Sequence, residues 1–243
     1  MTLLSRLDTE LVQRSLTKSR TIAQTLIKDG KVYVNGGIVQ KPSFEVTSAD
    51  EITVKGDLPK YVGRGGIKLE KAITDFGIKL DGCTCIDAGA STGGFTDCML
   101  QNGAARVYAV DVGSAQLDEK LRADKRVISL ENTDIRNAAE KIPEKADFIT
   151  ADVSFISLKL VLPEIKNLLK PDGEAVALIK PQFEVGKSGL NKHGVVKDEN
   201  LRTQAVEEIK RFSADLGFTV NGVMTSPITG GEGNIEYLIH LSL

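Results

Sequence analysis

The amino-acid sequence predicts an α/β protein in which a Rossmann-like domain with a seven-stranded sheet follows a small α+β domain. Strand and helix signals alternate over most of the chain, which is typical of a mainly parallel sheet covered by helices on both faces. A glycine-rich turn stands directly after the first strand of that pattern, where open α/β sheets bind ligands. With 243 residues, 41% of them hydrophobic, the chain is long enough for one large core and a second, smaller one.

The division of the chain follows from turn-forming residues and from the change of pattern around them. We expect a first domain over residues 1–57, a linker over 58–63 and the α/β domain over 64–243. The run Gly-Asp-Leu-Pro at 56–59 has the turn formers of a linker.

The elements of the small domain are indicated by short periodic runs. Two helices are expected within residues 7–29, the second opening at Thr17 or Ser19 and ending at a glycine. Residues 31–39 alternate in hydrophobicity around an Asn-Gly pair, which predicts a β-hairpin. A further strand over 51–54 completes the unit.

The α/β domain shows seven strand signals with helix signals between most of them. Strands are expected over 84–87, 106–111, 127–130, 148–151, 175–179, 218–225 and 237–241. Helices are expected over 67–76, 94–101, 116–121, 158–169 and 199–216. The last two strands have only a loop between them and are expected to pair antiparallel. Residues 182–196 are expected to form a mobile loop that closes on substrate.

Charge is distributed unevenly along the chain. The net charge is −2, which argues against a wholly basic nucleic-acid-binding surface. Between residues 6 and 41, however, seven Lys and Arg residues stand against three Asp and Glu residues, so the remainder of the chain is acidic. This asymmetry predicts a polyanionic partner for the N-terminal domain.

Other functional classes leave no signal in the sequence. Cys83, Cys85 and Cys98 are interpreted as small buried hydrophobes, and no metal site is predicted because His193 and His240 lie far from them and from each other. The N-terminus lacks the apolar core of a signal peptide, and no run is long and apolar enough to span a bilayer. We therefore expect a cytoplasmic protein without a membrane partner.

The strongest local signal is the run 87–95, Asp-Ala-Gly-Ala-Ser-Thr-Gly-Gly-Phe, which joins the first strand of the α/β domain to its helix. Glycines in such a turn let a ligand approach the backbone, and the open helix N-terminus offers free amides to an anionic group. The second strand ends about twenty residues later in Asp111, where a carboxylate can accept both hydroxyls of a ribose. Together these features predict a nucleoside cofactor.

The spacing of the glycines indicates which nucleoside is bound. Gly89, Gly93 and Gly94 stand behind an acidic Asp87 and miss the Gly-x-Gly-x-x-Gly pattern of dinucleotide-binding enzymes. The arrangement suits methyltransferases, whose cofactor S-adenosylmethionine presents an amino acid to this turn. The third strand is followed by the polar run 131–134, which is expected to contact the adenine edge.

Charged residues follow the fourth and fifth strands. Asp152 opens the run Asp-Val-Ser-Phe, and Lys180 precedes Pro181. Carboxyl ends of adjacent parallel strands face the same crevice, so these two side chains are expected to meet. A second glycine run, Gly186-Lys-Ser, is not a phosphate-binding loop, because Pro181 stands where the first glycine of that motif is required.

Taken together, these runs resemble those of the TlyA-type proteins, historically called hemolysins and understood as 2′-O-ribose methyltransferases of ribosomal RNA. The likeness spans nearly the whole chain. In the N-terminal part, the segments at 6–8, 18–20 and 30–36 look like the small RNA-binding domain first described in a small-subunit ribosomal protein. In the rest, the segments that resemble the catalytic motifs lie at 64–69, 87–96, 111–113, 152–155 and 180–184. One departure is Asp134, where the family's Asn-Ile-Arg-type motif begins with asparagine.

The resemblance implies an S-adenosylmethionine-dependent methyltransferase related to FtsJ. It also implies that four residues of this chain form a catalytic tetrad. Related ribose methyltransferases use Lys-Asp-Lys-Glu, and the matching positions are Lys68, Asp152, Lys180 and Glu236. Because a ribose hydroxyl is a poor nucleophile, a lysine is needed to take its proton. Lys180 is the candidate base, with Asp152 and Glu236 orienting it and Lys68 placing the ribose.

The residue assignments that follow are expectations for two surfaces. Contacts to the cofactor are expected from Asp87, Gly89, Ala90, Ser91, Thr92, Gly93, Gly94, Phe95, Asp111, Val112, Thr133, Asp134, Asp152 and Phe155. Contacts to RNA are expected from Arg6, Arg14, Lys18, Ser19, Arg20, Lys31, Asn35 and Lys41. The implied partner is ribosomal RNA or a ribosomal subunit, with no obligate protein partner. The implied target is a cytidine, and the short ends favour large-subunit RNA.

Four alternatives were weighed. Methylation of a cytosine carbon usually needs a cysteine nucleophile, and no cysteine follows Cys98. Methylation of an amine usually places an Asn/Asp-Pro-Pro-aromatic run after the fourth strand, whereas residues 152–155 contain no proline. A membrane-active hemolysin lacks an apolar span or an amphipathic helix to act with. A noncatalytic RNA-binding factor for ribosome assembly stays open as an alternative.

Overall fold

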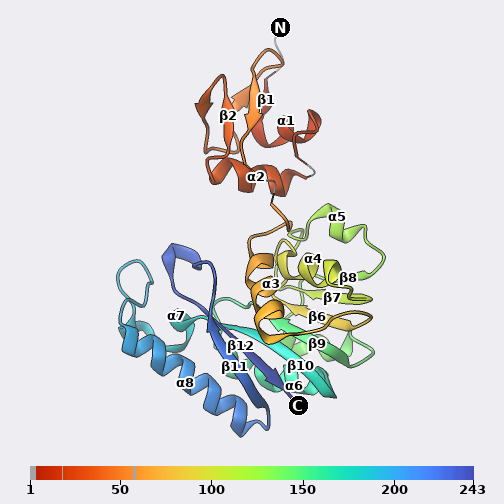
Figure 1. Cartoon of the computed structure of the whole chain (residues 1–243), viewed down its shortest axis with the longest axis vertical. Coiled ribbons are helices and arrows are strands. Elements are labelled where there is room, and N and C mark those ends of the chain that lie inside the picture. Colours follow the sequence, from red (N-terminus) through yellow and green to blue (C-terminus); the bar gives the residue numbers. More distant parts are fainter. Residues whose placement is uncertain (1–3, 18, 57–58) are drawn as a thin grey trace.

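The computed structural model describes residues 4–17, 19–56 and 59–243, and within these ranges the chain forms a small N-terminal unit and a larger α/β unit. Figure 1 shows the small unit in red and orange, joined to the larger one by the segment around residue 60. Lys18, one of the expected RNA contacts, lies outside the described residues. Residues 57 and 58, at the boundary between the expected first domain and the expected linker, also lie outside them.

The small unit contains two helices and five short strands. Helix α1 (Leu7–Gln13) is followed by α2 (Arg20–Lys28), whose first turn is capped by the Ser19 hydroxyl accepting from the Ile22 amide at 3.3 Å. Strand β2 (Val32–Val34) pairs with β3 (Gly37–Ile38) and β5 (Ile52–Val54). Strand β1 (Ser5–Arg6) pairs with β4 (Glu45–Val46). Both helices and the hairpin were predicted, whereas β1 and β4 were not.

The hairpin turn and the small core explain why these residues fold as they do. Asn35 and Gly36 have φ of 50° and 80°, the pair of left-handed residues that a tight two-residue hairpin turn requires. The apolar residues of both helices and of β2 meet in one cluster, in which Leu7, Leu11, Leu26, Ile27 and Val32 are fully buried.

Arg14 is used inside this unit. Its guanidinium donates to the backbone carbonyls of Asp50 and Thr47 at 2.7 and 2.8 Å and to the Glu10 carboxylate at 2.8 Å, and the side chain is only 26% exposed. Arg14 therefore ties helix α1 to the loop before β5. Three of its five N–H donors are used in this structural role, and the expectation that Arg14 contacts RNA stays a prediction.

The α/β unit is built on one seven-stranded sheet with the order β11-β12-β10-β9-β6-β7-β8. Five strands are parallel: β6 (Thr84–Ala88), β7 (Arg106–Val110), β8 (Val127–Leu130), β9 (Ala146–Ala151) and β10 (Leu169–Ile179). Strand β12 (Tyr237–Ser242) inserts antiparallel between β10 and β11 (Thr219–Thr225). The seven predicted strands are all present, and the predicted antiparallel pairing of the last two is confirmed.

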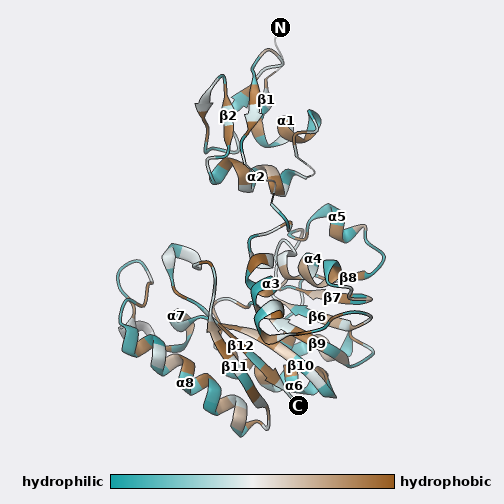
Figure 2. Cartoon of the chain, in the orientation of Figure 1, coloured by the Kyte–Doolittle hydropathy of each residue, from teal (hydrophilic) through white to brown (hydrophobic). Residues whose placement is uncertain are grey.

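Helices cover both faces of this sheet, as the alternation of strands and helices predicts. Helices α3 (Gly65–Phe76) and α4 (Gly94–Gln101) pack in one buried cluster with strand residues such as Cys85 and Val176. The opposite face carries the 3₁₀ helix η1 (Ile135–Glu140), α6 (Leu162–Leu168) and α8 (Glu199–Asp215). Figure 2 shows brown, apolar segments along the sheet and teal, polar stretches on the outer side of α8.

Several predicted boundaries were wrong, among them that of the strand predicted over 175–179, which begins at Leu169. The helix predicted over 116–121 is the single turn α5 (Glu119–Arg122). The helix predicted over 158–169 is divided into the 3₁₀ helix η2 (Leu158–Leu160) and α6, and Leu169 already belongs to β10. The segment predicted as a loop over 182–196 contains α7 (Pro181–Glu184) and the 3₁₀ turn η3 (Lys187–Gly189) before it becomes irregular. In the case of α5, Asp118 caps the turn, so the helix starts later than the hydrophobic pattern does.

The turn after β6 depends on close backbone packing. Gly89 has a φ of 86°, and a Cβ at this residue would lie 2.6 Å from the carbonyl oxygen of Asp152. Gly93 has a φ of 94° and caps α4 with Leu117 and Leu121 packed against its Cα. These contacts bring the end of β6 and the end of β9 together, which is the point where the strand order reverses.

Asp87 lies beneath this turn, fully buried. Its carboxylate accepts from the hydroxyls of Thr96 at 2.7 Å and Thr150 at 3.0 Å, so it joins β6, α4 and β9. Burial raises the pKa of Asp87 to about 6, against the opposing effect of the two threonine hydrogen bonds.

None of the helices in the described ranges combines the length and the apolarity that a membrane crossing needs. Across the same ranges, His, Cys, Asp and Glu side chains form no group of three or more suited to a metal ion.

Replacing Arg14 with alanine is expected to loosen the small unit. The change leaves the carbonyls of Thr47 and Asp50 without their donor, at a cost of about 1–3 kcal/mol. Hydrogen–deuterium exchange of the full chain is expected to show amides of α1 and β4 exchanging about tenfold to a hundredfold faster. Lys41→Ala, which removes an exposed charge from the same unit, serves as the control. Unchanged exchange in the Arg14 variant would contradict the structural role.

The buried Asp87 carboxyl is expected to make stability fall as pH rises. Its pKa is higher in the folded than in the unfolded chain, so its contribution is fully present below about pH 4 and is lost as pH rises through about 6. The stability advantage of the parent over Asp87→Asn is expected to shrink by about 1 kcal/mol between pH 5 and pH 7. Urea unfolding of both proteins across this pH range measures the difference in their free energies of unfolding. The contributions of the other carboxyl groups are the same in both proteins and cancel in this difference. A difference that stays constant or grows with pH would show that Asp87 is ionised more easily than its burial implies.

Candidate active site

Four charged side chains meet at the carboxyl edge of the sheet. Lys68 comes from α3, Asp152 follows β9, Lys180 follows β10, and Glu236 precedes β12. The sequence expectation that Asp152 and Lys180 meet agrees with the structure, which also places the other two residues beside them.

These four residues form a chain of alternating charge. The Lys68 ammonium lies 2.7 Å from Glu236 and 3.8 Å from Asp152, and the Lys180 ammonium lies 2.6 Å from the other oxygen of Asp152. The side chains of both lysines are 10% exposed, that of Glu236 is 3% exposed and that of Asp152 is 21% exposed. Buried charges need partners, and here two positive and two negative groups balance.

Ser154 completes the surroundings of Lys180. Its hydroxyl accepts a hydrogen bond from the lysine Nζ at 2.9 Å. Ser154 belongs to the run Asp-Val-Ser-Phe after β9, in which only Asp152 and Phe155 were expected to have a role. Its position two residues after Asp152 could have indicated this contact, because both side chains belong to the same short segment after β9.

Glycine 230 provides the space in which the Glu236 carboxylate lies. A Cβ at Gly230 would stand 2.0 Å from the Glu236 carboxylate, which no side chain can accommodate. The backbone carbonyl of Glu236 accepts from the Ser226 amide at 2.9 Å, which closes the loop between β11 and β12. The loop thus holds the carboxylate against Lys68.

Asn234 is a second residue that sequence analysis missed. It is 4% exposed, and its side-chain oxygen accepts from the Val196 amide at 3.2 Å. Its amide nitrogen donates to the carbonyls of Gly194 and Gly231 at 3.1 and 3.2 Å. Asn234 therefore joins the segment after η3 to the loop that carries Glu236, and a lone asparagine in a glycine-rich loop offered no sequence pattern that could reveal this.

A cavity of about 650 Å³ opens beside the four charges. Its walls come from the ends of β6, β7 and β9 and from the segments that follow β8 and β9. Eight of the expected cofactor residues line it, namely Gly89, Ser91, Asp111, Val112, Thr133, Asp134, Asp152 and Phe155. Apolar side chains of Ile135, Val153, Ile156, Leu160 and Val161 complete it.

A smaller cavity of about 140 Å³ adjoins the first and shares Gly89, Ser91 and Asp152 with it. It is formed by the turn after β6 and by residues 63–65. The further expected cofactor residues that line it are Ala90, Thr92, Gly94 and Phe95. Asp152 lines both cavities and also belongs to the chain of alternating charge. It therefore connects the two cavities to the other three charged residues.

Two expected cofactor residues, Asp87 and Gly93, line neither cavity. Asp87 faces the interior between Thr96 and Thr150, and Gly93 is covered by two leucines. Both are corrected to supports of the turn, because their burial removes them from the cavity surface.

The polar residues at the cavity are already hydrogen-bonded within the chain. One Asp111 oxygen accepts from the Ser91 amide and the other from the Gly113 amide, both at 2.7 Å. The Asp134 carboxylate caps η1 and pairs with Arg136, and the Thr133 hydroxyl accepts from Lys141 at 2.8 Å. Carboxylate oxygens have further lone pairs, so Asp111 keeps the capacity to accept ribose hydroxyls.

The cavities suit a nucleoside joined to an amino acid. The larger one has the size of a small-molecule site, an acid at the end of β7 and an apolar wall. The smaller one is walled by the close-packed turn in front of α4, whose open N-terminus favours a carboxylate. S-adenosylmethionine consists of a nucleoside and an amino acid of this kind. Asp152 lines both cavities and pairs with both lysines, so the junction of the cavities lies next to Lys68 and Lys180.

Phe155 stands at the mouth of the larger cavity. Its side chain is 91% exposed, its φ is 62°, and its ring centroid lies 5.2 Å from that of Phe183 on α7. A left-handed φ at a bulky residue costs free energy, which marks this position as one held by its surroundings.

The expected RNA-contact residues divide into two groups in the structure. Arg6 and Arg20 both pair with the fully buried Asp8 carboxylate, at 3.0 and 3.1 Å, while about half of each arginine side chain stays exposed. Those two arginines hold the pKa of Asp8 well below its usual range, together with a hydrogen bond from Gln24. Lys41 is exposed and Lys31 is half-buried.

The second group is used within the domain. Ser19 caps α2, and Arg14 holds the loop before β5. Asn35 donates to Asp50 at 2.7 Å and accepts from the Glu51 amide at 2.9 Å, which fastens the hairpin turn to the neighbouring strand. A phosphate-binding surface of this unit would therefore rely on Arg6, Arg20 and the lysines.

Comparisons with known proteins agree with this geometry. The family model described as FtsJ-like methyltransferase matches residues 61–243, and the S4 domain model matches residues 5–52. The chain is 44% identical over 239 residues to the 16S/23S rRNA (cytidine-2′-O)-methyltransferase TlyA of Mycobacterium tuberculosis, covering 98% of this chain and 89% of that protein. It is 42% identical to Hemolysin A of Brachyspira hyodysenteriae, covering 97% and 98% of the two chains.

A solved structure extends the likeness to three dimensions. A candidate hemolysin of Streptococcus thermophilus, 42% identical in sequence, superposes with a TM-score of 0.78 over 100% of this chain and 89% of that one. The chain accordingly belongs to the FtsJ-like methyltransferases, and within them to the TlyA proteins that carry an S4 domain in front of the catalytic one.

Proposed function

We propose that this protein transfers a methyl group from S-adenosylmethionine to a ribose 2′-hydroxyl of ribosomal RNA, with a cytidine as the target nucleotide. The observation that carries the proposal is the chain Glu236–Lys68–Asp152–Lys180, whose Asp152 lines both cofactor cavities. The name of the mycobacterial relative, an rRNA (cytidine-2′-O)-methyltransferase, supports the choice of RNA and of cytidine.

The chemistry requires a group that removes the proton from a weakly acidic hydroxyl. We assign this role to Lys180, whose Nζ takes the proton as the ribose oxygen forms its bond to the methyl carbon. Asp152 at 2.6 Å and Ser154 at 2.9 Å fix the direction of that nitrogen and stabilise the ammonium that results. Bound S-adenosylmethionine supplies the methyl group as a sulfonium and leaves as a neutral thioether.

Lys68 and Glu236 position the substrate in this proposal. Glu236 holds the Lys68 ammonium at 2.7 Å, which leaves the lysine the capacity for two further hydrogen bonds. A ribose hydroxyl or phosphate oxygen is a suitable acceptor for them. Because both residues are nearly fully buried, the pair is present before RNA binds, and its orientation requires little rearrangement.

The S4 domain is assigned the role of holding RNA by its phosphates. Asp8 presents the guanidinium groups of Arg6 and Arg20 side by side, and a pair of anchored arginines suits a phosphodiester better than flexible lysines do. Such contacts place the RNA without reading its sequence.

The decisive experiment incubates the full chain and labelled S-adenosylmethionine with unmodified large and small ribosomal subunits, followed by mapping of ribose methylation. Label is expected at a cytidine 2′-oxygen of large-subunit RNA. Cofactor binding without label in either RNA would favour a noncatalytic RNA-binding factor instead.

Lys180→Ala is expected to abolish this methylation, with a loss of at least a hundredfold in kcat because the proton acceptor is gone. Binding of S-adenosylmethionine, measured by calorimetry, and binding of the ribosomal subunit are expected to change less than threefold. Lys159→Ala, whose lysine pairs with Glu208 on α8, is the matched control. Near-normal turnover of the Lys180 variant would overturn the assignment of the base.

Arg20→Ala is expected to weaken RNA binding about tenfold at moderate salt while kcat at saturating RNA stays within twofold. The slope of log affinity against log salt is expected to fall by about 1, since one phosphate contact is lost. Arg126→Ala provides the control, because that arginine pairs with Asp124 before β8, at the amino edge of the sheet. A loss of kcat with unchanged RNA affinity would place Arg20 outside the RNA-binding surface.

A further inference from the structure

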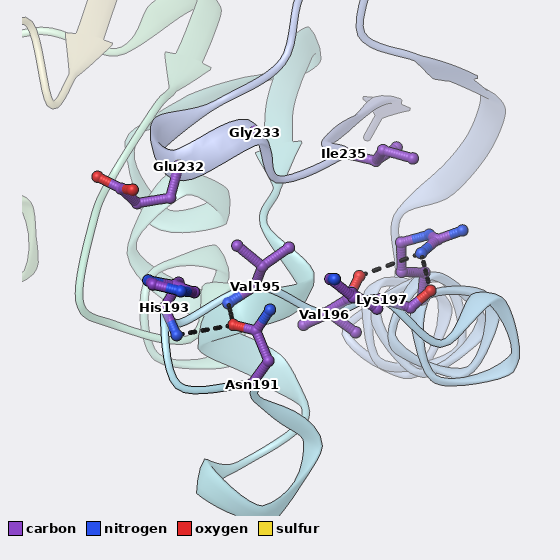
Figure 3. A pocket seen from close by; sticks show the side chains of 9 residues that line it. Asn191, His193, Val195, Val196, Lys197, Glu232, Gly233 and Ile235 are labelled. Carbon is purple, nitrogen blue, oxygen red and sulfur yellow. Dashed lines mark hydrogen bonds between the residues drawn. The ribbon is translucent and has the colours of Figure 1, made fainter.

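A third cavity, of about 540 Å³, lies apart from the two cofactor cavities. It is bounded by the segment 191–197, by the first turn of α8 and by the segment 232–235 that contains part of the 3₁₀ turn η4 (Gly231–Gly233). Figure 3 shows the two segments facing each other, with the side chain of Val195 directed from one toward Gly233 and Glu232 on the other.

The walls of this cavity are held in place by side-chain hydrogen bonds. The Asn191 side-chain oxygen accepts from the amides of His193 and Val195, both at 2.9 Å, and so fixes the tip of the first segment. The Arg202 guanidinium donates to the carbonyls of Val196 and Lys197 at 3.1 and 2.7 Å. Asn234 joins the two segments. The cavity is therefore formed before any ligand arrives.

The lining combines positive charge with apolar surface. The cationic Lys197 and Arg202 and the polar His193 line it together with one acidic residue, Glu232. The Nε of Arg202 is buried and has no hydrogen-bond partner among the described residues. Val195 and Ile235, the latter 37% exposed, supply apolar atoms between these polar groups. A phosphodiester meets the cationic side chains and a nucleobase meets the apolar ones, so the lining matches a nucleotide.

The cavity shares a wall with the catalytic chain of charges. Ile235 lines the cavity, while the next residue, Glu236, is 2% exposed and binds Lys68. Successive side chains of an extended segment point to opposite sides. One short segment therefore forms part of the cavity wall and also carries a residue of the charge chain.

We propose that this cavity is a subsite for a second nucleotide of the RNA substrate, outside the one that is methylated. The proposal rests on the proposed function. Lys197 and His193 bind the phosphate of that nucleotide, and its base contacts Val195 and Ile235. Because Ile235 lines the cavity and directly precedes Glu236, a nucleotide bound there contacts the segment that positions Glu236.

The first test replaces Lys197 with alanine in the full chain. The KM for unmodified ribosomal subunits is expected to rise fivefold to tenfold, with kcat within twofold and the Kd for S-adenosylmethionine unchanged. Lys79→Ala is the matched control, because Lys79 is exposed and stands before β6, at the opposite edge of the sheet. An unchanged KM in the Lys197 variant would overturn the subsite.

The second test asks which RNA residue lies in the cavity. A photoreactive benzoylphenylalanine in place of the exposed His193 is expected to crosslink to one short stretch of ribosomal RNA next to the methylated cytidine in space. Crosslinks scattered over the RNA, or none, would overturn the proposal even if the protein folds and methylates normally.

The two proposals fail in distinguishable ways. If the parent protein neither binds nor methylates ribosomal RNA, the proposed function fails and the subsite with it. If the parent methylates RNA while Lys197→Ala behaves as Lys79→Ala does and His193 gives no local crosslink, only the subsite fails.

Discussion

The pairing of buried charges at the carboxyl edge of the sheet is the constraint on which the rest of the α/β unit depends. Lys68 and Glu236 are both almost fully buried, and either one without the other would leave a charge in the protein interior, which costs several kcal/mol. The pair connects α3 near the start of the domain to the strand β12 that comes 168 residues later. Correct assembly of the sheet is thus required before these charges are satisfied.

Glycines provide the space that this pairing needs. Gly89 allows the turn after β6 to touch the backbone of Asp152, and Gly230 allows the Glu236 carboxylate to lie against its own loop. A methyl group at Gly89 would stand only 2.6 Å from the carbonyl oxygen of Asp152, and one at Gly230 only 2.0 Å from the Glu236 carboxylate. The absence of a side chain at Gly89 and Gly230 is therefore as necessary to the geometry of the site as the four charged residues are.

Much of the fold was accessible from the sequence, because its strands are buried runs bounded by turns and its hairpin has an Asn-Gly pair. Strands β1 and β4 were missed since two residues are too few to show a period. Asp152 and Lys180 were predicted to meet because both follow neighbouring strands. Lys68 and Glu236 came only from the family resemblance, as residues so distant in sequence have no spacing that relates them.

The differences between the expected and the observed site have separate physical reasons. Asp87 lies one residue before the end of β6, whereas Asp111 directly follows β7. The pleat of β6 turns the Asp87 side chain inward, toward Thr150, and periodicity alone did not show which side faces the ligand. Arg14 was predicted to bind RNA because it is basic, whereas its donors meet carbonyls 33 and 36 residues away. Asn234 acts through backbone groups of a loop, and such contacts leave no pattern in side-chain types.

The antiparallel insertion of β12 has a consequence for the order in which the enzyme matures. Because β12 lies between β10 and β11, the sheet edge formed by β10 has no neighbour until β12 emerges from the ribosome. Glu236 immediately precedes that strand, so a nascent chain that has completed its S4 domain and both cofactor cavities still lacks one of the four charges. The set of four charges is therefore complete only when the segment that leads into the last strand has been synthesised.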